Sequence, residues 1–330
     1  LMLTDLGWVQ VMTSPFMDAG ALTSWQLSQE DSRARLVRVA NPMSDENPFM
    51  RSTLLPSLFA VLERNRGRGF DSAAVFERSA THQGRVASVA SPPTHARPDV
   101  SVLATLDDAL PTEIVVASGA AFGEHTCAGV FGKGRNWQWS DAVDAALSLC
   151  RVAGVSASAT AASLSPWHPG RCASIVVTTQ RGDVVVGHAG EIHPRVIESF
   201  GGPAGVVAFE VDVDALAALA AEQPWPSVGE PLPTSAVVKE AVALVVPSSV
   251  PASAVQKALR DGCGPMLEEV RLFDRYVGEQ VPSGHVSLAF DLRFRHPERT
   301  LTDEEVAQMR AEGIANATRI TGALLRGASS

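Results

Sequence analysis

The sequence lacks cysteine pairs and long apolar runs, and each absence narrows the class of protein. Its four cysteines are scattered and form no CxxC pair, so neither a zinc ribbon nor a disulfide framework is indicated. The longest apolar runs, such as Val242 to Val246, are far too short to cross a bilayer. No basic stretch followed by an apolar one opens the chain, which argues against a signal peptide. We therefore expect a cytoplasmic protein with reduced cysteines, no membrane contact and no bound metal.

A surplus of basic residues is also missing. The chain carries 27 Lys and Arg against 36 Asp and Glu, a formal net charge of −9. Broad, non-specific binding to nucleic acids depends on excess positive charge, so DNA is not an expected partner. Most of the acidic surplus precedes residue 234, so the C-terminal part would repel a polyanion less.

Proline marks the expected domain boundary. A length of 330 residues suggests about two domains. Residues 222–233 hold four prolines, which neither a helix nor a central strand accommodates. We predict a first domain over 1–221, a linker over 222–233 and a second domain over 234–330. Because the chain runs into fold-like sequence directly from Leu1, we expect it to be a piece of a longer protein.

The second domain reads as two β-α-β units. Ser249 suits the cap of a helix with Pro251 in its first turn, and Thr302 with Glu305 forms a capping box before a second helix. The expected elements are a strand at 241–246, a helix from the Ser249 cap to 262, strands at 267–276 and 287–295, a helix from the Thr302 cap to 321, and a short strand at 323–326. This order predicts a ferredoxin-like βαββαβ sandwich, a fold that by itself implies no function.

The first domain shows several strands in succession with few crossover helices, which favours an antiparallel sheet in an α+β domain. Apolar periodicity predicts strands at 35–39, 73–77, 114–118, 175–179, 183–187 and 206–211, and helices at 50–64, 140–152 and 193–199. The first helix carries a leucine-rich face made of Leu54, Leu55, Leu58, Phe59 and Leu62. That face has two possible partners, the sheet of its own domain or a second protein chain.

Two short motifs look like functional sites but have better structural explanations. His188 to His193 brings two histidines and a glutamate together, yet it matches neither zinc-protease pattern, and Gly190 interrupts the helix that such a site needs. We interpret it as a turn leading into a helix that starts at Pro194. Gly129 to Gly134 resembles a phosphate loop without its Lys-Ser/Thr ending, and we expect a surface loop.

Three stretches of the sequence together carry a resemblance to a known family. They are NPMSDENPFMRSTLLP (41–56, continuing through 64–67 to 75–77), GHAGEIHP with AFEVDVDAL (187–194 and 208–216), and VRLFDRYVG with SLAF and RFR (270–278, 287–290 and 293–295). Their order and spacing resemble the C-terminal part of the β subunit of bacterial phenylalanine–tRNA ligases. The resemblance implies a class II synthetase-like, catalytically inactive domain with an antiparallel sheet, followed by a ferredoxin-like anticodon-binding domain.

The residues that amino-acid activation needs are missing from the first domain. Activation requires cations that stabilise charge on ATP phosphates, and class II synthetases supply arginines after one strand and in a later Gly-rich segment. Here the strand at 75–77 leads to Arg78 without that pattern. The later segment holds no arginine but three carboxylates, Glu210, Asp212 and Asp214, which would repel a nucleotide. We therefore expect no catalytic residue and no ATP site in this chain.

The resemblance also implies partners. A catalytic α subunit would use ATP and Mg²⁺ to charge tRNA-Phe with phenylalanine, within an (αβ)₂ heterotetramer. This chain would need no cofactor of its own, and the residues that edit mischarged tRNA would lie N-terminal of it. The resemblance favours the subunit interface as a partner for the leucine-rich face.

The expected anticodon-reading residues lie in the second domain. Asp274 and Tyr276 are two apart on a strand and so share a face. There an aromatic ring stacks on an anticodon base while a carboxylate accepts hydrogen bonds from guanine. The resemblance places these roles on Asp274, Tyr276 and, across the neighbouring strand, Ser287.

Two arginines complete the expected tRNA-binding site. Arg293 and Arg295 share a strand face and are expected to hold phosphates, with His296 and Arg299 extending the basic stretch.

A structural interpretation stays open, in which Tyr276 covers the edge of the core and the arginines are solvated. Two other functions also remain: a synthetase paralogue that acts only as a protein-interaction scaffold without tRNA, and an independently active aminoacylating enzyme, which the missing arginines disfavour.

Overall fold

The structure, a computed structural model, describes residues 1–84, 89–92, 94–130, 132–222 and 234–326. Contacts divide the chain into two compact units, Leu1–Pro226 and Ser227–Ser330. Apart from Glu222, the predicted linker lies outside the described residues. In the described residues no helix is both long enough and apolar enough to span a membrane.

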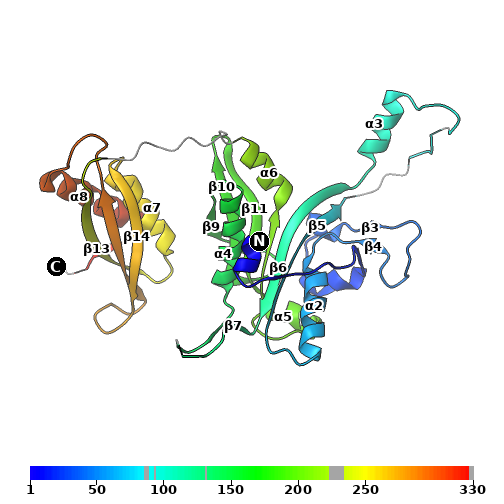
Figure 1. Cartoon of the computed structure of the whole chain (residues 1–330), viewed down its shortest axis with the longest axis horizontal. Coiled ribbons are helices and arrows are strands. Elements are labelled where there is room, and N and C mark those ends of the chain that lie inside the picture. The colour runs from blue at the N-terminus through cyan, green and yellow to red at the C-terminus, as the bar shows by residue number, and fades with distance from the viewer. Residues whose placement is uncertain (85–88, 93, 131, 223–233, 327–330) are drawn as a thin grey trace. The chain divides into compact units, whose positions relative to one another are not determined.

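A seven-stranded sheet forms the centre of the first unit (Figure 1). Its first pair, β1 with β5, is parallel, and every other neighbouring pair is antiparallel. The α+β prediction is therefore confirmed, with one parallel edge strand that was not expected. In spatial order the strands are β1 (Val9–Gln10), β5 (Ala73–Gln83), β6 (Thr112–Phe122), β12 (Val207–Asp212), β11 (Gly182–Ile192), β10 (Trp167–Thr179) and β9 (Ser158–Ala161).

Helices cover both faces of this sheet, and the alternation along β12 separates the two cores. Val207, Phe209 and Val211 pack in the core that includes α4 (Trp139–Val152), whereas Ala208 packs in the core that includes α2 (Leu55–Gly67). Glu210 and Asp212 lie two and four residues after Ala208 on the same strand, so their side chains point to the same face, the α2 side of the sheet. The remaining helices are α1 (Met2–Asp5), α3 (Val100–Asp108), α5 (Pro194–Ser199) and α6 (Val213–Ala221).

The predicted helix over 50–64 begins later than expected. Met50 lies in strand β4 (Phe49–Met50), and α2 starts at Leu55 with Pro56 in its first turn. Residues 51–54 stay outside the helix because Arg51, Ser52 and Thr53 are buried and make tertiary hydrogen bonds. The whole leucine-rich face is at most 3% exposed within this unit, so it packs on its own sheet rather than on a partner chain.

The interpretation of His188 to His193 as a turn is wrong, although the helix after it does start at Pro194. Residues up to Ile192 belong to β11, and His193 caps α5 by accepting a hydrogen bond from the backbone N–H of Arg195 (3.2 Å). Glycine is needed at position 190, because a Cβ there would overlap the carbonyl oxygen of Arg171 on β10. The segment thus continues the sheet where two backbones approach closely.

Short elements complete the first unit. A three-stranded sheet contains β2 (Phe16–Met17), β4 and β3 (Val37–Arg38), and a hairpin pairs β7 (Glu124–Thr126) with β8 (Arg135–Asn136). Two 3₁₀ helices span Ala19–Trp25 and Ser32–Ala34. Helix α3 lies beyond the ends of β5 and β6 (Figure 1), and none of its residues is buried.

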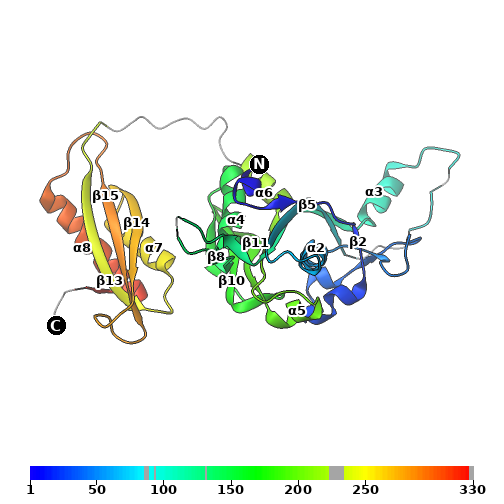
Figure 2. The same ribbon diagram turned by 60° about the horizontal axis from the view of Figure 1, so that its bottom comes forward.

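The second unit is the expected ferredoxin-like sandwich. Its antiparallel sheet has the order β14-β15-β13-β16, and Figure 2 shows β15 between β13 and β14. The capping box of Thr302 and Glu305 is present, and Gly322 ends the following helix in the left-handed conformation (φ 71°). The predicted Ser249 cap is wrong, since Pro251 occupies that position. The elements are β13 (Val238–Pro247), α7 (Ala252–Cys263), β14 (Leu267–Tyr276), β15 (His285–Phe294), α8 (Asp303–Thr321) and β16 (Leu324–Leu325).

Candidate functional site

The second unit has one sheet face packed on helices and one that they leave uncovered. Along β15, alternate residues from Val286 to Phe294 are buried in the core shared with α7 and α8. The residues between them, Ser287, Ala289, Asp291 and Arg293, therefore point to the opposite side. We call this side the open face of the second unit.

The structure brings Asp274, Tyr276 and Ser287 together on the open face. Tyr276 pairs directly with Ser287, and Asp274 pairs with Ala289, the next open-face position along β15. A bulge between Leu272 and Asp274 shifts the register of β14 by one residue, which brings both Asp274 and Tyr276 to the open face. Asp274 is exposed and Tyr276 is half-buried.

Ser287 is less accessible than a base-contacting residue is expected to be. It is only 2% exposed, and among the described residues its hydroxyl makes no hydrogen bond. The guanidinium of Arg326 lies 5.0 Å from the centroid of the Tyr276 ring. Arg326 was not identified from the sequence, because 50 residues and a whole helix separate it from Tyr276.

Arg293 and Arg295 lie toward the other end of the open face, and carboxylates already neutralise them. Arg293 donates to Glu269 (3.1 Å), and Arg295 lies 3.3 Å from Glu268 and donates to the carbonyl oxygen of Ser235 (2.9 Å). Six residues separate Ser287 from Arg293, about 20 Å along an antiparallel strand. The arginines are ion-paired rather than freely solvated, and a phosphate would have to compete with these glutamates.

The two residues expected to extend the basic stretch are likewise engaged. Arg299 forms a two-pronged hydrogen-bonded pair with Glu305 at the start of α8, and the His296 ring accepts from the backbone N–H of Glu298 (3.1 Å). The pairing with Arg299 lowers the pKa of Glu305 to about 2. Through these contacts Arg299 holds Glu305, which is part of the capping box at the start of α8.

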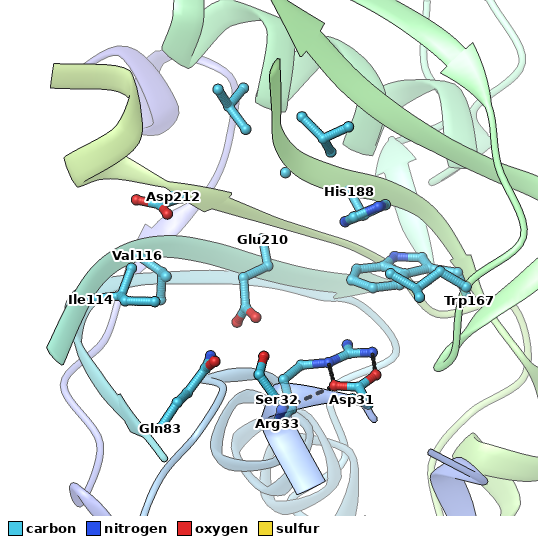
Figure 3. A pocket seen from close by; sticks show the side chains of 14 residues that line it. Asp31, Ser32, Arg33, Gln83, Ile114, Val116, Trp167, His188, Glu210 and Asp212 are labelled. Atoms are coloured by element: carbon cyan, nitrogen blue, oxygen red, sulfur yellow. Dashed lines mark hydrogen bonds and ion pairs between the residues drawn. The ribbon is translucent and has the colours of Figure 1, made fainter. Parts of the chain in front are cut away.

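A second candidate site is a cavity of about 400 Å³ in the first unit, on the α2 side of the sheet. Figure 3 shows Glu210 at its centre, with Asp31 and Arg33 on one side and Trp167 and His188 beside them. Among the described lining residues Arg33 is the one arginine. It forms a bidentate ion pair with Asp31 (2.7 and 3.0 Å) and donates to the carbonyl oxygen of Ser165, so its charge is already balanced.

The other acidic residues that line this cavity are two carboxylates on β12. Glu210 and Asp212 both line it, whereas the third expected carboxylate, Asp214, accepts from the backbone N–H of Val115 (2.8 Å) and is not among its lining residues. Burial and the nearby Arg33 lower the pKa of His188 to about 4, so the imidazole is neutral at pH 7. The sequence did not reveal that Asp31, Arg33 and His188 belong to this site.

Glu210 also has a structural role. Its Oε2 accepts three hydrogen bonds, from the Thr53 hydroxyl (2.8 Å), the Leu54 backbone N–H (3.0 Å) and the Ser118 hydroxyl (2.7 Å). Leu54 is the N-cap of α2, so the carboxylate also lies at the positive end of that helix. Among the described residues, no group of three or more His, Cys, Asp or Glu is placed to hold a metal ion.

Comparisons with known proteins match two parts of the chain to two family models. Residues 1–213 match the family described as "Phenylalanyl tRNA synthetase beta chain CLM domain", and residues 233–326 match "Ferredoxin-fold anticodon binding domain". A solved pyrrolysyl tRNA synthetase from Desulfitobacterium hafniense superposes with a TM-score of 0.41 at 14% identity, covering 65% of this chain and 63% of that one. That score is too low for a shared fold to follow from it.

Curated relatives cover almost the whole chain. Phenylalanine–tRNA ligase β subunits from Thermobifida fusca, Streptomyces avermitilis and Mycolicibacterium paratuberculosis are 42%, 40% and 37% identical to it, each over 98% of this chain. The chain spans only 38–39% of the length of these relatives. With both parts matched in order, the chain belongs to the phenylalanyl-tRNA synthetase β-chain family, through its CLM domain and the anticodon-binding-type domain that follows.

Proposed function

We propose that this chain is the non-catalytic C-terminal region of the β subunit of a cytoplasmic phenylalanine–tRNA ligase. Its second unit binds the anticodon of tRNA-Phe, and its first unit, a class II synthetase-like domain without activity, supports the catalytic α subunit in an (αβ)₂ heterotetramer. The whole enzyme uses ATP and Mg²⁺ to charge the tRNA. The β-subunit relatives and the matched anticodon-binding domain support this assignment.

The observation that carries the tRNA-binding role is the cluster of Asp274, Tyr276 and Ser287 on the open face. Single-stranded bases are recognised by stacking on aromatic rings and by hydrogen bonds to their edges. Tyr276 supplies the ring, Asp274 an exposed carboxylate that accepts from a base edge, and Ser287 a hydroxyl without a partner among the described residues. Arg293 and Arg295 remain proposed phosphate contacts, which require exchange of their glutamate partners.

Binding of unmodified tRNA-Phe transcripts tests this role. We expect the chain to prefer the phenylalanine anticodon over a transcript with changed anticodon bases. Tyr276→Ala should weaken binding by about 5- to 150-fold and abolish the preference, because base–aromatic stacking contributes about 1–3 kcal/mol. Fluorescence anisotropy at two salt concentrations measures both effects.

Phe273→Ala is the matched control, because Phe273 is an exposed aromatic residue in the bulge of the same strand. It should leave the anticodon preference intact. Equal binding to all transcripts, or no effect of Tyr276→Ala, would remove the site assignment and favour a paralogue that acts only as a scaffold.

The missing ATP site gives a second prediction. The cavity in the first unit presents Glu210 and Asp212, a neutral His188 and an arginine already paired with Asp31. We expect calorimetry to detect no ATP binding with Mg²⁺ at concentrations up to about 1 mM, the level at which an interaction of about −4 kcal/mol becomes visible. Measurable binding would show that this domain retains a nucleotide site, and the assignment of all chemistry to α would have to be withdrawn.

A further inference from the structure

Arg326 lies on the open face, at the level of the predicted anticodon-reading residues. Its backbone N–H donates to the carbonyl oxygen of Ala243 (2.8 Å), which fixes the residue beside β13. Its guanidinium lies 5.0 Å from the centroid of the Tyr276 ring. Tyr276 belongs to β14, the edge strand on the opposite side of the sheet from β16. The two side chains therefore meet above the middle strands β13 and β15.

The residues beneath this pair are small. Ala243 pairs with Ala289, and Ser287 lies between Val245 and Tyr276 in the register of the sheet. Ser287 is only 2% exposed, and its neighbour across the strands is Tyr276, the ring that Arg326 contacts. The Ser287 hydroxyl makes no hydrogen bond among the described residues, so it can donate to or accept from a ligand that reaches it.

The charge of Arg326 is available in a way that those of its neighbours are not. Its Nη2 donates to the side-chain oxygen of Gln280 (2.7 Å), a neutral partner. In contrast, Arg271 and Arg293 on the same face are paired with Asp291 and Glu269. Arg326 can therefore bind a phosphate without breaking an ion pair recorded among the described residues.

We propose that Arg326 is a further tRNA-contacting residue that rests on Tyr276 in the free protein and moves to the RNA backbone when a base takes its place on the ring. The inference rests on the proposed anticodon-binding role of the second unit. A base stacked on an aromatic ring interacts more strongly than an exposed guanidinium does, so the base displaces Arg326. The same movement uncovers the Ser287 hydroxyl for the base edge.

Nuclear magnetic resonance of the tyrosine ring tests the displacement. Tyr276 is the only tyrosine, so the full chain labelled with ¹³C-tyrosine gives one set of ring signals. In the free protein, Arg326→Ala should shift these signals, because the guanidinium leaves the ring. With a tRNA-Phe anticodon stem-loop bound, wild type and variant should give the same signals. Bound signals that still differ would mean that Arg326 stays on the ring, which overturns the displacement.

The salt dependence of binding tests the phosphate contact independently. The slope of log affinity against log salt concentration should become shallower by about 0.7 in Arg326→Ala, the amount for one phosphate contact with a single strand. Arg326→Lys should keep the wild-type slope, because the charge remains. Arg275→Ala is the control, since Arg275 is exposed but alternates with Asp274 and Tyr276 to the other side of β14. An unchanged slope in Arg326→Ala would refute the contact.

Different experimental results would contradict the anticodon-binding role of the second unit and the role of Arg326. If the stem-loop leaves the Tyr276 ring signals of the wild type unchanged at saturating concentrations, the anticodon-binding role itself is wrong. If the wild-type signals shift but Arg326→Ala changes neither the slope nor the free ring signals, only the role of Arg326 is wrong.

Discussion

Replacing Arg51 with methionine is expected to lower the free energy of unfolding of the first unit by about 3–5 kcal/mol, the usual cost of removing one partner of a buried ion pair. Arg51 donates to Glu77 at 2.9 Å, and the two side chains are only 2% and 4% exposed. Without the guanidinium, the Glu77 carboxylate stays buried in an environment that disfavours charge. The substitution thus costs more than the ion pair contributes.

The surrounding contacts make this pair a junction between three segments. Arg51 also donates to the Thr13 hydroxyl (2.8 Å) and to the carbonyl oxygen of Ala80 (3.3 Å). Glu77 accepts from both the backbone N–H and the hydroxyl of Thr13 (3.1 and 2.6 Å). Losing Arg51 therefore loosens the segment before β2 and the start of α2 relative to β5.

Urea unfolding followed by tryptophan fluorescence measures this effect selectively, because no tryptophan occurs after Trp225 and the described ones all lie in the first unit. Arg151→Met is the matched control: its side chain is 70% exposed and 3.9 Å from Asp144, so we expect a change of at most about 1 kcal/mol. The double variant Arg51→Met, Glu77→Leu should be more stable than Arg51→Met alone, because no unpaired charge remains. Equal losses in Arg51→Met and the control would contradict the junction role.

The second unit was predictable because its sequence signals are local and agree with one another. The strand over 267–276 has the predicted bounds, and the capping box of Thr302 and Glu305 is present. Strict alternation with one buried face gives a clear period of two. What the sequence did not reveal there depends on long-range pairing: the bulge after Leu272, and the carboxylates that meet Arg293 and Arg295 across the strands.

The first unit was less predictable for two physical reasons. Strands of two residues, such as β1 and β2, contain no full period, so their pairing is set by tertiary contacts alone. Helix α2 begins at Leu55 because tertiary partners outweigh the helical pattern of residues 51–54. The cavity is assembled from six separate parts of the chain, near residues 31–33, 83, 114–116, 164–167, 185–188 and 210–212, and no local pattern unites them.

Glu210 was recognised from the sequence as a charge that repels a nucleotide, and the structure adds that it supports the fold. We expect Glu210→Leu to lower the free energy of unfolding by about 3 kcal/mol, because it removes one charge-assisted acceptor shared by three donors. Two of these donors, the Leu54 N–H and the Thr53 hydroxyl, lie at the start of α2. The loss also removes a negative charge from the positive end of that helix.

Glu210→Gln separates the structural role from the charge. Its amide oxygen can accept the same hydrogen bonds, so we expect a loss of only about 1 kcal/mol, measured by the same urea titration. Glu113→Leu, at a side chain that is 63% exposed, should change stability by less than about 0.5 kcal/mol. If Glu210→Gln is as destabilising as Glu210→Leu, the negative charge rather than the hydrogen-bond acceptor stabilises the start of α2. Glu210→Gln should still fail to bind ATP, because removing one repulsive charge supplies none of the cations that the phosphates need; ATP binding by this variant would mean that repulsion by Glu210 alone had closed the site.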